Sequence, residues 1–299
     1  MLLGRIVKSD SGYYYVRTPR GEELLCRARG RFRKDSFSPL VGDLAEVDPT
    51  EAGKGYLVDI RPRKNAFLRP AVANLDLMVI LAANVNPVTD PFLVDRVAVI
   101  AQRAGCGVVI CVNKCDLDPG DALFAAFSTH TGYPVLRTSA VTGAGVEELR
   151  SLLSGKVSAF TGNSGVGKSS LLNRLDPGLA LSVGEVSERL GRGRHTTRHV
   201  SLLPLGPDTL IADTPGFSSF DPARMPPIPK GELQNCFPDF RPWLGRCRFE
   251  DCAHLKEPGC AVLEALAAGE IAPSRHESYR RLYEISAGYK DWENKQSSS

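Results

Sequence analysis

A glycine-rich segment in the second half of the chain has the residue types and spacing that bind phosphate groups. It reads GNSGVGKS, fits the pattern GxxxxGK[ST], and lies between the apolar run VSAFTG and the helix-like run SSLLNRL. Glycines let the backbone wrap phosphates with its N–H groups, and a helix N-terminus adds positive potential. We expect Lys168 to be catalytic by contacting the β- and γ-phosphates, and the Ser169 hydroxyl to ligate Mg²⁺. The predicted phosphate-binding residues are Gly162, Asn163, Ser164, Gly165, Val166, Gly167, Lys168, Ser169 and Ser170.

A second motif, NKCD from Asn113 to Asp116, follows the apolar run VVICV and predicts which base accompanies those phosphates. The carboxylate of Asp116 can accept two hydrogen bonds from guanine, at N1–H and the 2-amino group, whereas adenine offers neither donor. We expect Asn113 to brace the loop and the stem of Lys114 to cover one face of the purine. Ser139 and Ala140 end another predicted strand and could present a backbone N–H to guanine O6. Taken alone, each match is short, and a polar turn after a strand is the simpler interpretation.

A third motif, DTPG, ends the apolar run TLIAD. We expect Asp213 to hold Mg²⁺ indirectly and the Gly216 N–H to sense the γ-phosphate. Between the two phosphate motifs, the segment GRGRHTTR carries Thr196 and Thr197, either of which could supply the second Mg²⁺ ligand for catalysis. The sequence does not choose between these two threonines.

Three cysteines and one histidine crowd together near the end of the chain. Cys247, Cys252, His254 and Cys260 give the spacing C-x4-C-x-H-x5-C. Four such ligands suit a closed tetrahedral Zn²⁺ site, which is structural because it leaves no open coordination position. The alternative is a set of buried free cysteines. With no apolar export signal at the start, metal binding is favoured over disulfides, and we expect a cytoplasmic protein without a membrane partner.

Basic residues are concentrated at the beginning of the chain. The formal net charge is +3, but residues 1–70 carry 14 Lys and Arg against 9 Asp and Glu, which favours a polyanionic partner there. Within this region, Arg27, Arg29, Arg31 and Arg33 alternate and would share one side of an extended segment, as expected of a face that contacts phosphates. An edge strand protected by charge is the alternative. The run with Arg275, Arg280 and Arg281 is a second candidate for RNA contact, and Tyr279 and Tyr283 are predicted to pack.

The elements that must position these residues follow from hydrophobic patterning. Residues 1–65 read as five short strands between turns, which suggests a small β-barrel: LLGRIVKS, GYYYVRTP, EELLCRAR, GDLAEVDP and YLVDIRPR. From about residue 70, buried strands alternate with helices, which predicts a parallel sheet covered on both faces. VSLLPL and TLIAD are predicted to form a hairpin. After Phe220 a Pro-rich linker precedes the cysteine cluster and two helical runs.

The order of the motifs differs from that of ordinary GTPases, in which the phosphate loop comes first. Here NKCD and the Ser139–Ala140 element precede GNSGVGKS and DTPG. This order indicates a circular permutation, which is allowed because the ends of a compact domain are often adjacent. The nucleotide site can then persist intact, while DTPG leads directly into the C-terminal region.

Together these features resemble the RsgA (YjeQ) family of small ribosomal subunit biogenesis GTPases over about residues 1–290. The permuted motifs and the ending CRFEDCAHLKEPGCAV carry the resemblance. It implies a multidomain protein: an all-β OB-fold barrel (1–65), a circularly permuted α/β P-loop GTPase domain (66–221), and a helical zinc-binding domain with a disordered tail (222–299). It also implies hydrolysis of GTP to GDP, stimulated by the small (30S) subunit late in its maturation. The OB-fold and zinc domains would bind its 16S rRNA.

The residue after DTPG is Phe217, where Ras-like enzymes have the glutamine that orients the attacking water. Phenylalanine cannot orient water, so we expect slow turnover by the isolated protein. By proximity and by the resemblance, His195 is the candidate to position water when the ribosome docks. A solvent-facing histidine or a contact to RNA phosphate is an equally good interpretation of His195.

Two other functions fit parts of the sequence. An ATP-driven nucleic-acid motor would use the same phosphate loop, but Asp116 argues against adenine. A switch that binds GTP without hydrolysing it is compatible with Phe217. A monomer is the simplest expectation for the oligomeric state.

Overall fold

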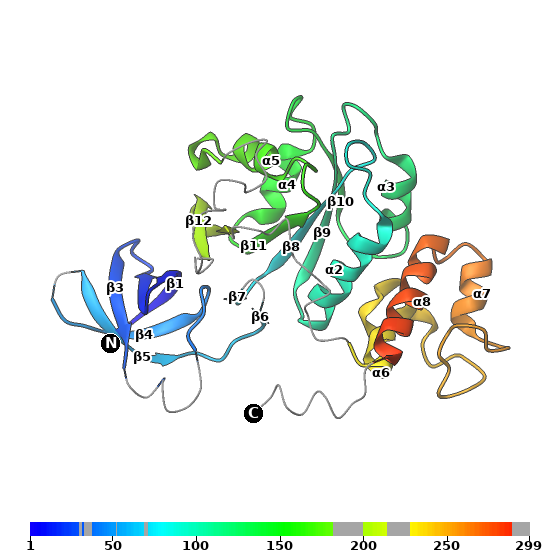
Figure 1. Cartoon of the computed structure of the whole chain (residues 1–299), viewed down its shortest axis with the longest axis horizontal. Helices are drawn as coiled ribbons and strands as arrows, with labels where there is room; N and C mark the ends of the chain where they lie inside the picture. Colours follow the sequence, from blue (N-terminus) through cyan, green and yellow to red (C-terminus); the bar gives the residue numbers. More distant parts are fainter. Residues whose placement is uncertain are drawn as a thin grey trace.

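The computed structural model describes residues 1–29, 32, 38–51, 53–68, 71–181, 200–213 and 228–288. A barrel of strands, a central sheet with helices, and a helical C-terminal group follow one another along the chain (Figure 1). Several predicted residues lie outside the described ranges: Arg31, Arg33, His195, Thr196, Thr197, Gly216 and Phe217.

The N-terminal strands close into a barrel, as predicted. The pairs β1–β2, β2–β3, β4–β5 and β1–β4 are antiparallel, and β3–β5 is parallel. Inward positions alternate with outward ones, and Ile6, Val16 and Leu57 are fully buried. The strands are β1 (Leu2–Asp10), β2 (Tyr13–Arg17), β3 (Glu23–Ala28), β4 (Leu44–Pro49) and β5 (Lys54–Ile60).

The central sheet has the strand order β10-β9-β8-β11-β13-β12. The first five strands are parallel, and β12 pairs with β13 as the predicted antiparallel hairpin. A single pairing of Lys8 with Ser201 joins this sheet to the barrel. The strands are β8 (Leu77–Ala82), β9 (Gly107–Asn113), β10 (Val135–Thr138), β11 (Val157–Gly162), β12 (Ser201–Gly206) and β13 (Thr209–Asp213).

Helices cover both faces of the sheet, which explains why β8 is apolar at every position. Met78 and Ile80 belong to the cluster of buried side chains that includes α2 and α3, whereas Val79 and Leu81 belong to the cluster with α4 and α5. The helices are α2 (Pro91–Arg103), α3 (Asp121–Ser128), α4 (Val146–Leu153) and α5 (Lys168–Leu175), followed by the short 3-10 helix η1 (Pro177–Leu179).

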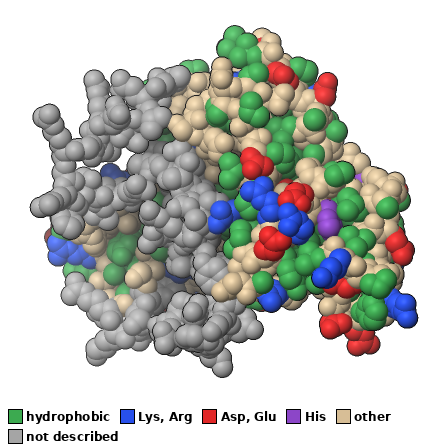
Figure 2. Space-filling view, turned by 45° about the vertical axis from the view of Figure 1, so that its right-hand side comes forward, with side chains coloured by type: hydrophobic (Ala, Val, Ile, Leu, Met, Phe, Trp, Pro, Cys, Tyr) green, Lys and Arg blue, Asp and Glu red, His purple; other side chains and the backbone are tan. Residues whose placement is uncertain are grey.

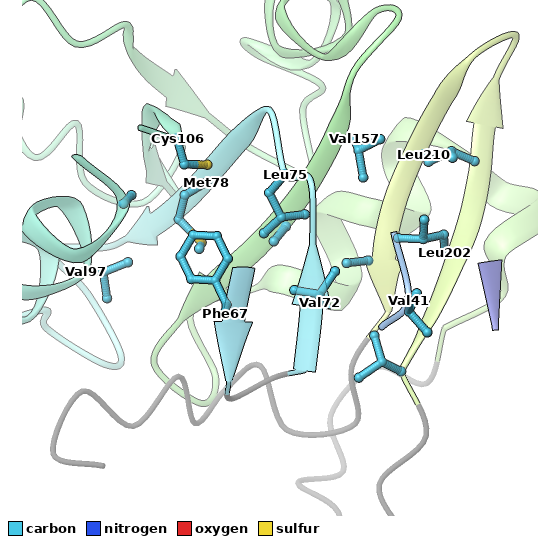
Figure 3. Close-up of a cluster of buried hydrophobic side chains, with 14 of the residues drawn as sticks. Val41, Phe67, Val72, Leu75, Met78, Val97, Cys106, Val157, Leu202 and Leu210 are labelled. Atoms are coloured by element: carbon cyan, nitrogen blue, oxygen red, sulfur yellow. The ribbon is translucent and has the colours of Figure 1, made fainter. Parts of the chain in front are cut away.

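A second, two-stranded sheet was not predicted. It consists of β6 (Ala66–Leu68) and β7 (Ala71–Ala73). Phe67 and Val72 are buried, and Figure 3 shows them between Met78 of the central sheet and Val41 next to the barrel. The hairpin therefore extends the apolar core between the two regions. Strands of this length are too short for an alternating pattern to reveal them.

The C-terminal group packs against α2. Phe237, Phe240 and Tyr279 share a buried cluster with Phe92 and Val99 of α2. Tyr279 therefore packs, as predicted. The elements are α6 (Lys230–Leu233), the 3-10 helices η5 (Gln234–Cys236) and η6 (Pro238–Trp243), α7 (Ala261–Ala267) and α8 (Pro273–Ala287). Among the described residues, no helix has the length and apolar character that crossing a membrane requires.

The prediction that Arg275 contacts RNA is wrong. Its side chain is fully buried, with ion pairs to Asp95 of α2 and to Asp239, the latter at 2.6 Å. Burial disfavours the guanidinium charge, but the two carboxylates outweigh it and raise the pKa of Arg275, while burial raises the pKa of Asp95 to about 6. On the described part of the face in Figure 2, basic and acidic side chains lie next to one another.

Candidate functional site

The phosphate-loop motif lies between β11 and α5, as the sequence predicts. Gly162 ends β11 with φ +153°, and a Cβ there would lie 2.6 Å from the Leu81 carbonyl oxygen. Val166 is buried, and its N–H donates to the Asn163 carbonyl at 3.1 Å. Lys168 is the first residue of α5, so the motif leads into a helix N-terminus whose first N–H groups lack intrahelical acceptors. Such an arrangement can bind phosphate oxygens.

Asn113 joins the NKCD motif to the phosphate-loop motif. It is the last residue of β9 and only 1% exposed. Its Nδ2 donates to the Val166 carbonyl at 2.8 Å, and its Oδ1 accepts from the Thr138 hydroxyl at 3.0 Å. Gly167 has φ +96°, and a Cβ there would lie 2.5 Å from Asn113 Nδ2. The structure therefore places two motifs that are far apart in sequence in direct contact.

The loop after Asn113 turns sharply and leaves Asp116 exposed. Lys114 adopts φ +63°, and the Cys115 N–H donates to the Thr138 carbonyl at 3.1 Å. The Lys114 carbonyl accepts from the Leu117 N–H at 2.9 Å. Because the side chain of Asp116 points to solvent rather than into the core, it is available to a ligand.

The Ser139–Ala140 element lies next to this loop, at the end of β10. Ser139 is fully buried, and its hydroxyl oxygen accepts from the N–H groups of Val141 and Thr142 at 3.2 and 3.1 Å. The Ser139 N–H donates to the Ala144 carbonyl at 3.0 Å. That donor is therefore occupied, and Ala140 is the member of the pair that remains a candidate to donate to guanine O6.

Asp213 is the last residue of β13, the parallel neighbour of β11 on the side away from β8. The pairing of Ala159 with Ala212 puts the end of β13 beside the strand that enters the phosphate loop. This backbone position suits the predicted indirect Mg²⁺ ligand. The other residues predicted to act on the γ-phosphate, His195, Thr196, Thr197 and Gly216, lie outside the described residues.

The four predicted metal ligands converge near the carboxyl end of the chain. The potential ligand atoms of Cys247, Cys252, His254 and Cys260 lie within 4.8 Å of one another. The Cys247 and Cys260 sulfurs are 3.9 Å apart, and His254 Nδ1 is 3.6 and 3.3 Å from them. Tetrahedral Zn–S bonds of about 2.3 Å place sulfurs about 3.8 Å apart. The donor set and its spacing therefore fit Zn²⁺.

Two further observations favour metal binding by His254. Its Nε2 lies 2.7 Å from Gln234 Oε1, an acceptor, so Nε2 carries the proton and Nδ1 is free to face the sulfurs. Burial lowers the pKa of His254, which favours the neutral ligand form. Gln234 was not predicted from the sequence, because it lies in a different segment from the ligands. Thr138 was not predicted either, although its place directly before Ser139 was a usable signal.

The comparisons with known proteins agree with this arrangement. The sequence profile of the RsgA GTPase family matches residues 60–223, and that of the RsgA N-terminal domain matches residues 3–57. The chain belongs to the RsgA GTPase family. RsgA family members hydrolyse GTP, and this chain is accordingly a GTPase.

Relatives in the RsgA family match over nearly the whole chain. The small ribosomal subunit biogenesis GTPases of Caldanaerobacter subterraneus subsp. tengcongensis and Geobacillus thermodenitrificans are 46% and 44% identical, each over 93% of this chain and 94% and 95% of the relative. YjeQ from Thermotoga maritima has a TM-score of 0.82 at 35% identity, covering 97% of this chain and 99% of that one.

The solved structure of YloQ, described as a circularly permuted GTPase, has a TM-score of 0.78 at 34% identity, covering 97% and 96% of the two chains. The predicted architecture is therefore confirmed: a barrel, a permuted GTPase domain, and a C-terminal region with the Cys and His cluster.

Proposed function

We propose that GTP binds where the Asn113 loop meets the phosphate loop, with Asp116 on the guanine edge and Ala140 near O6. The hydrogen bond from Asn113 Nδ2 to the Val166 carbonyl, 2.8 Å long, is the observation that carries this proposal. It fixes the distance between a base site and a phosphate site. Both sites also lie at the carboxyl ends of parallel strands, where α/β proteins bind ligands.

Hydrolysis in this site is a phosphoryl transfer to water, in which positioning and charge stabilisation do most of the work. Lys168 would balance charge on the β- and γ-phosphates, and the Ser169 hydroxyl together with Asp213 would hold Mg²⁺, which supplies further charge stabilisation when bound. Phe217 offers no hydrogen bond to the attacking water, so the isolated protein should turn over slowly. His195 is our candidate to position that water.

We further propose that the Cys and His cluster holds one Zn²⁺ in a structural role. Four protein ligands complete a tetrahedral shell and leave no position for a substrate. The site would cross-link residues 247–260, the segment that precedes α7. It would thereby hold together a region with few regular elements. Cys247, Cys252 and Cys260 would bind as thiolates, so metal binding would release protons.

The relatives are named for biogenesis of the small ribosomal subunit. We propose that this chain also acts there, late in maturation, as a monomer that contacts 16S rRNA of the 30S subunit. The barrel offers a suitable surface: Tyr13, Arg27 and Tyr56 are paired across β2, β3 and β5. The Arg27 guanidinium lies 4.5 Å from the Tyr13 ring centroid, and Tyr56 is exposed. Alternating aromatic and basic groups suit unpaired bases and their phosphates.

The pattern of four alternating arginines is only partly visible on this surface. Arg27 and Arg29 are exposed, but β3 ends at Ala28, and Arg29 forms an ion pair with Asp48. Next to Arg27 is a hollow of about 450 Å³, lined in part by Tyr13 and Phe32. This hollow lies on the same side of the barrel as the aromatic and basic row, and RNA could enter it.

The proposal is tested by multiple-turnover phosphate release with small subunits, with large subunits and with neither. We expect stimulation by small subunits only, and no release by Lys168→Ala under any condition. Equal rates in the three conditions would contradict the ribosomal role. Wild-type turnover by Lys168→Ala would contradict the phosphate-loop assignment. Separately, a mass of one chain, 32.4 kDa, measured by light scattering would support a monomer.

A further inference from the structure

The segment between β8 and α2, residues 83–90, contacts three parts of the molecule. It is closed at its base, because the Ala83 N–H donates to the Thr89 hydroxyl at 3.0 Å and the Thr89 N–H donates to the Ala83 carbonyl at 2.8 Å. Thr89 is buried. The segment is thus a closed loop whose ends are fixed to a central strand and to a helix.

One side of this segment contacts the guanine-reading loop. Asn84 Nδ2 donates to Asp118 Oδ2 at 3.0 Å, and Lys114 Nζ donates to the Asn86 carbonyl oxygen. These contacts hold the loop from the side opposite to Thr138. The ammonium of Lys114 is fixed in this way, and so is the stem that is expected to cover the purine.

The same segment reaches the phosphate loop. A Cβ on Gly165 would lie 3.6 Å from Pro87 Cδ, an ordinary van der Waals distance. Residues 84–87 therefore contact the base-reading loop and lie beside the phosphate loop. None of these residues belongs to the GTPase motifs found in the sequence.

The other end of the segment contacts the C-terminal region. Asp90 caps α2, because its Oδ1 accepts from the Phe92 N–H at 2.9 Å, and its Oδ2 lies 3.4 Å from Arg281 NH1 of α8. The Arg281 guanidinium also lies 3.6 Å from the ring centroid of Phe92. One turn further along α2, Asp95 pairs with the buried Arg275 of the same helix, α8.

We propose that residues 83–90 couple the nucleotide site to the C-terminal region. Asn84 and Asn86 are positioning residues for the guanine-reading loop, and Arg281 is the contact through which α8 holds the segment. This inference rests on the proposed nucleotide site. If α8 stabilises the binding-competent loop, then bound nucleotide must stabilise the attachment of α8 by the same factor, because coupling between two sites is reciprocal.

The neighbouring arginine provides a matched control. Arg280 pairs only within its own helix in the described structure, with Glu277 and Glu284, whereas Arg281 contacts α2. Arg281→Gln and Arg280→Gln remove the same charge from the same helix. In the full-length, zinc-loaded protein we expect Arg281→Gln to weaken GDP binding by about twofold to fivefold, and Arg280→Gln to leave it unchanged.

Calorimetric titration measures the GDP affinity of both variants. Amide hydrogen exchange of residues 273–287 measures the reciprocal effect, which is that of bound GDP on α8. GDP should increase protection of α8 in the wild type and in Arg280→Gln, and less so in Arg281→Gln. Equal GDP affinity of both variants and the wild type would overturn the coupling. Failure of the wild type to bind GDP would instead overturn the nucleotide site.

A second variant tests the positioning role without touching α8. Asn84→Ala leaves Asp118 Oδ2 without the side-chain amide of Asn84, while Oδ1 still accepts from the Gly120 N–H. We expect the variant to raise KM for GTP by about threefold to tenfold with little change in kcat. A merely structural role would lower both the melting temperature and kcat. An unchanged KM would overturn the positioning role of Asn84.

Discussion

The proposed nucleotide site and the Cys and His cluster are built in opposite ways. The four side chains of the cluster all come from residues 247–260, and one contact from Gln234 orients the histidine. The nucleotide site instead combines loops after β9, β10 and β11, which meet through Asn113. A local cluster depends on its ligand for order, whereas a distributed site depends on the sheet. Substitutions in the two sites should therefore have different effects on folding and on nucleotide binding.

The largest effect should follow loss of a metal ligand. Structural zinc contributes on the order of 10 kcal/mol to folding of small domains, so Cys252→Ser should lose about one equivalent of zinc and unfold residues 228–288. GDP affinity should fall by less than about tenfold, because the proposed nucleotide contacts lie on the central sheet. Metal analysis, hydrogen exchange and GDP titration measure the three outcomes. Cys236→Ala, a buried cysteine outside the cluster, should keep its zinc.

The next largest effect concerns the buried ion pairs that join α8 to α2. Arg275→Met leaves Asp95 and Asp239 without their cation, which should cost about 3 to 5 kcal/mol of unfolding free energy. Arg280→Met, on the exposed face of α8, should cost less than about 1 kcal/mol. Urea unfolding measures both. Similar losses in the two variants would show that the buried cluster is not what holds α8 in place.

A smaller effect should arise where the two nucleotide loops touch. Gly167→Ala places a Cβ 2.5 Å from Asn113 Nδ2 at a positive φ. Separating the loops should weaken GDP binding by about tenfold to a hundredfold. Gly155→Ala is the control, because it has φ +68° and nothing within 4 Å of the added Cβ. If Gly155→Ala weakened GDP binding as much, the contact with Asn113 would be irrelevant.

The smallest effect is expected at Thr138. Thr138→Val removes the hydroxyl that donates to Asn113 Oδ1, a loss of about 1 kcal/mol, or about fivefold in GDP affinity. Thr18→Val is its counterpart in the barrel, because the buried Thr18 hydroxyl has no hydrogen-bond partner among the described residues. GDP titration should show no change for Thr18→Val. A fivefold loss in both variants would point to general destabilisation.

Much of this architecture could be predicted from the sequence. Alternating apolar residues placed the strands of the barrel, and fully apolar runs placed β8 and β9. The convergence of the four proposed metal ligands was predictable because their spacing is local. The place of Asn113 beside the phosphate loop follows from the order of the strands in the sheet. The permutation hides that strand order, but the order of the motifs along the chain reveals it.

The rest was not predictable, for identifiable reasons. Arg275 has the same sequence context as an exposed arginine, and only the packing of α8 on α2 shows that Asp95 and Asp239 surround it. Gln234 follows a run that reads as a linker. The contacts of Asn84 and Asn86 depend on the path of one loop, and no periodic pattern encodes such a path.

The proposed nucleotide site requires that Asp116 reads the base of a nucleotide whose phosphates lie at Lys168. Xanthine replaces the 2-amino donor of guanine with a carbonyl acceptor, so Asp116→Asn presents a matching amide donor. Calorimetric titration of Asp116→Asn with GDP and XDP tests this directly. We expect the variant to favour XDP over GDP by about tenfold or more, reversing the wild-type preference. A GDP preference equal to that of the wild type would contradict it.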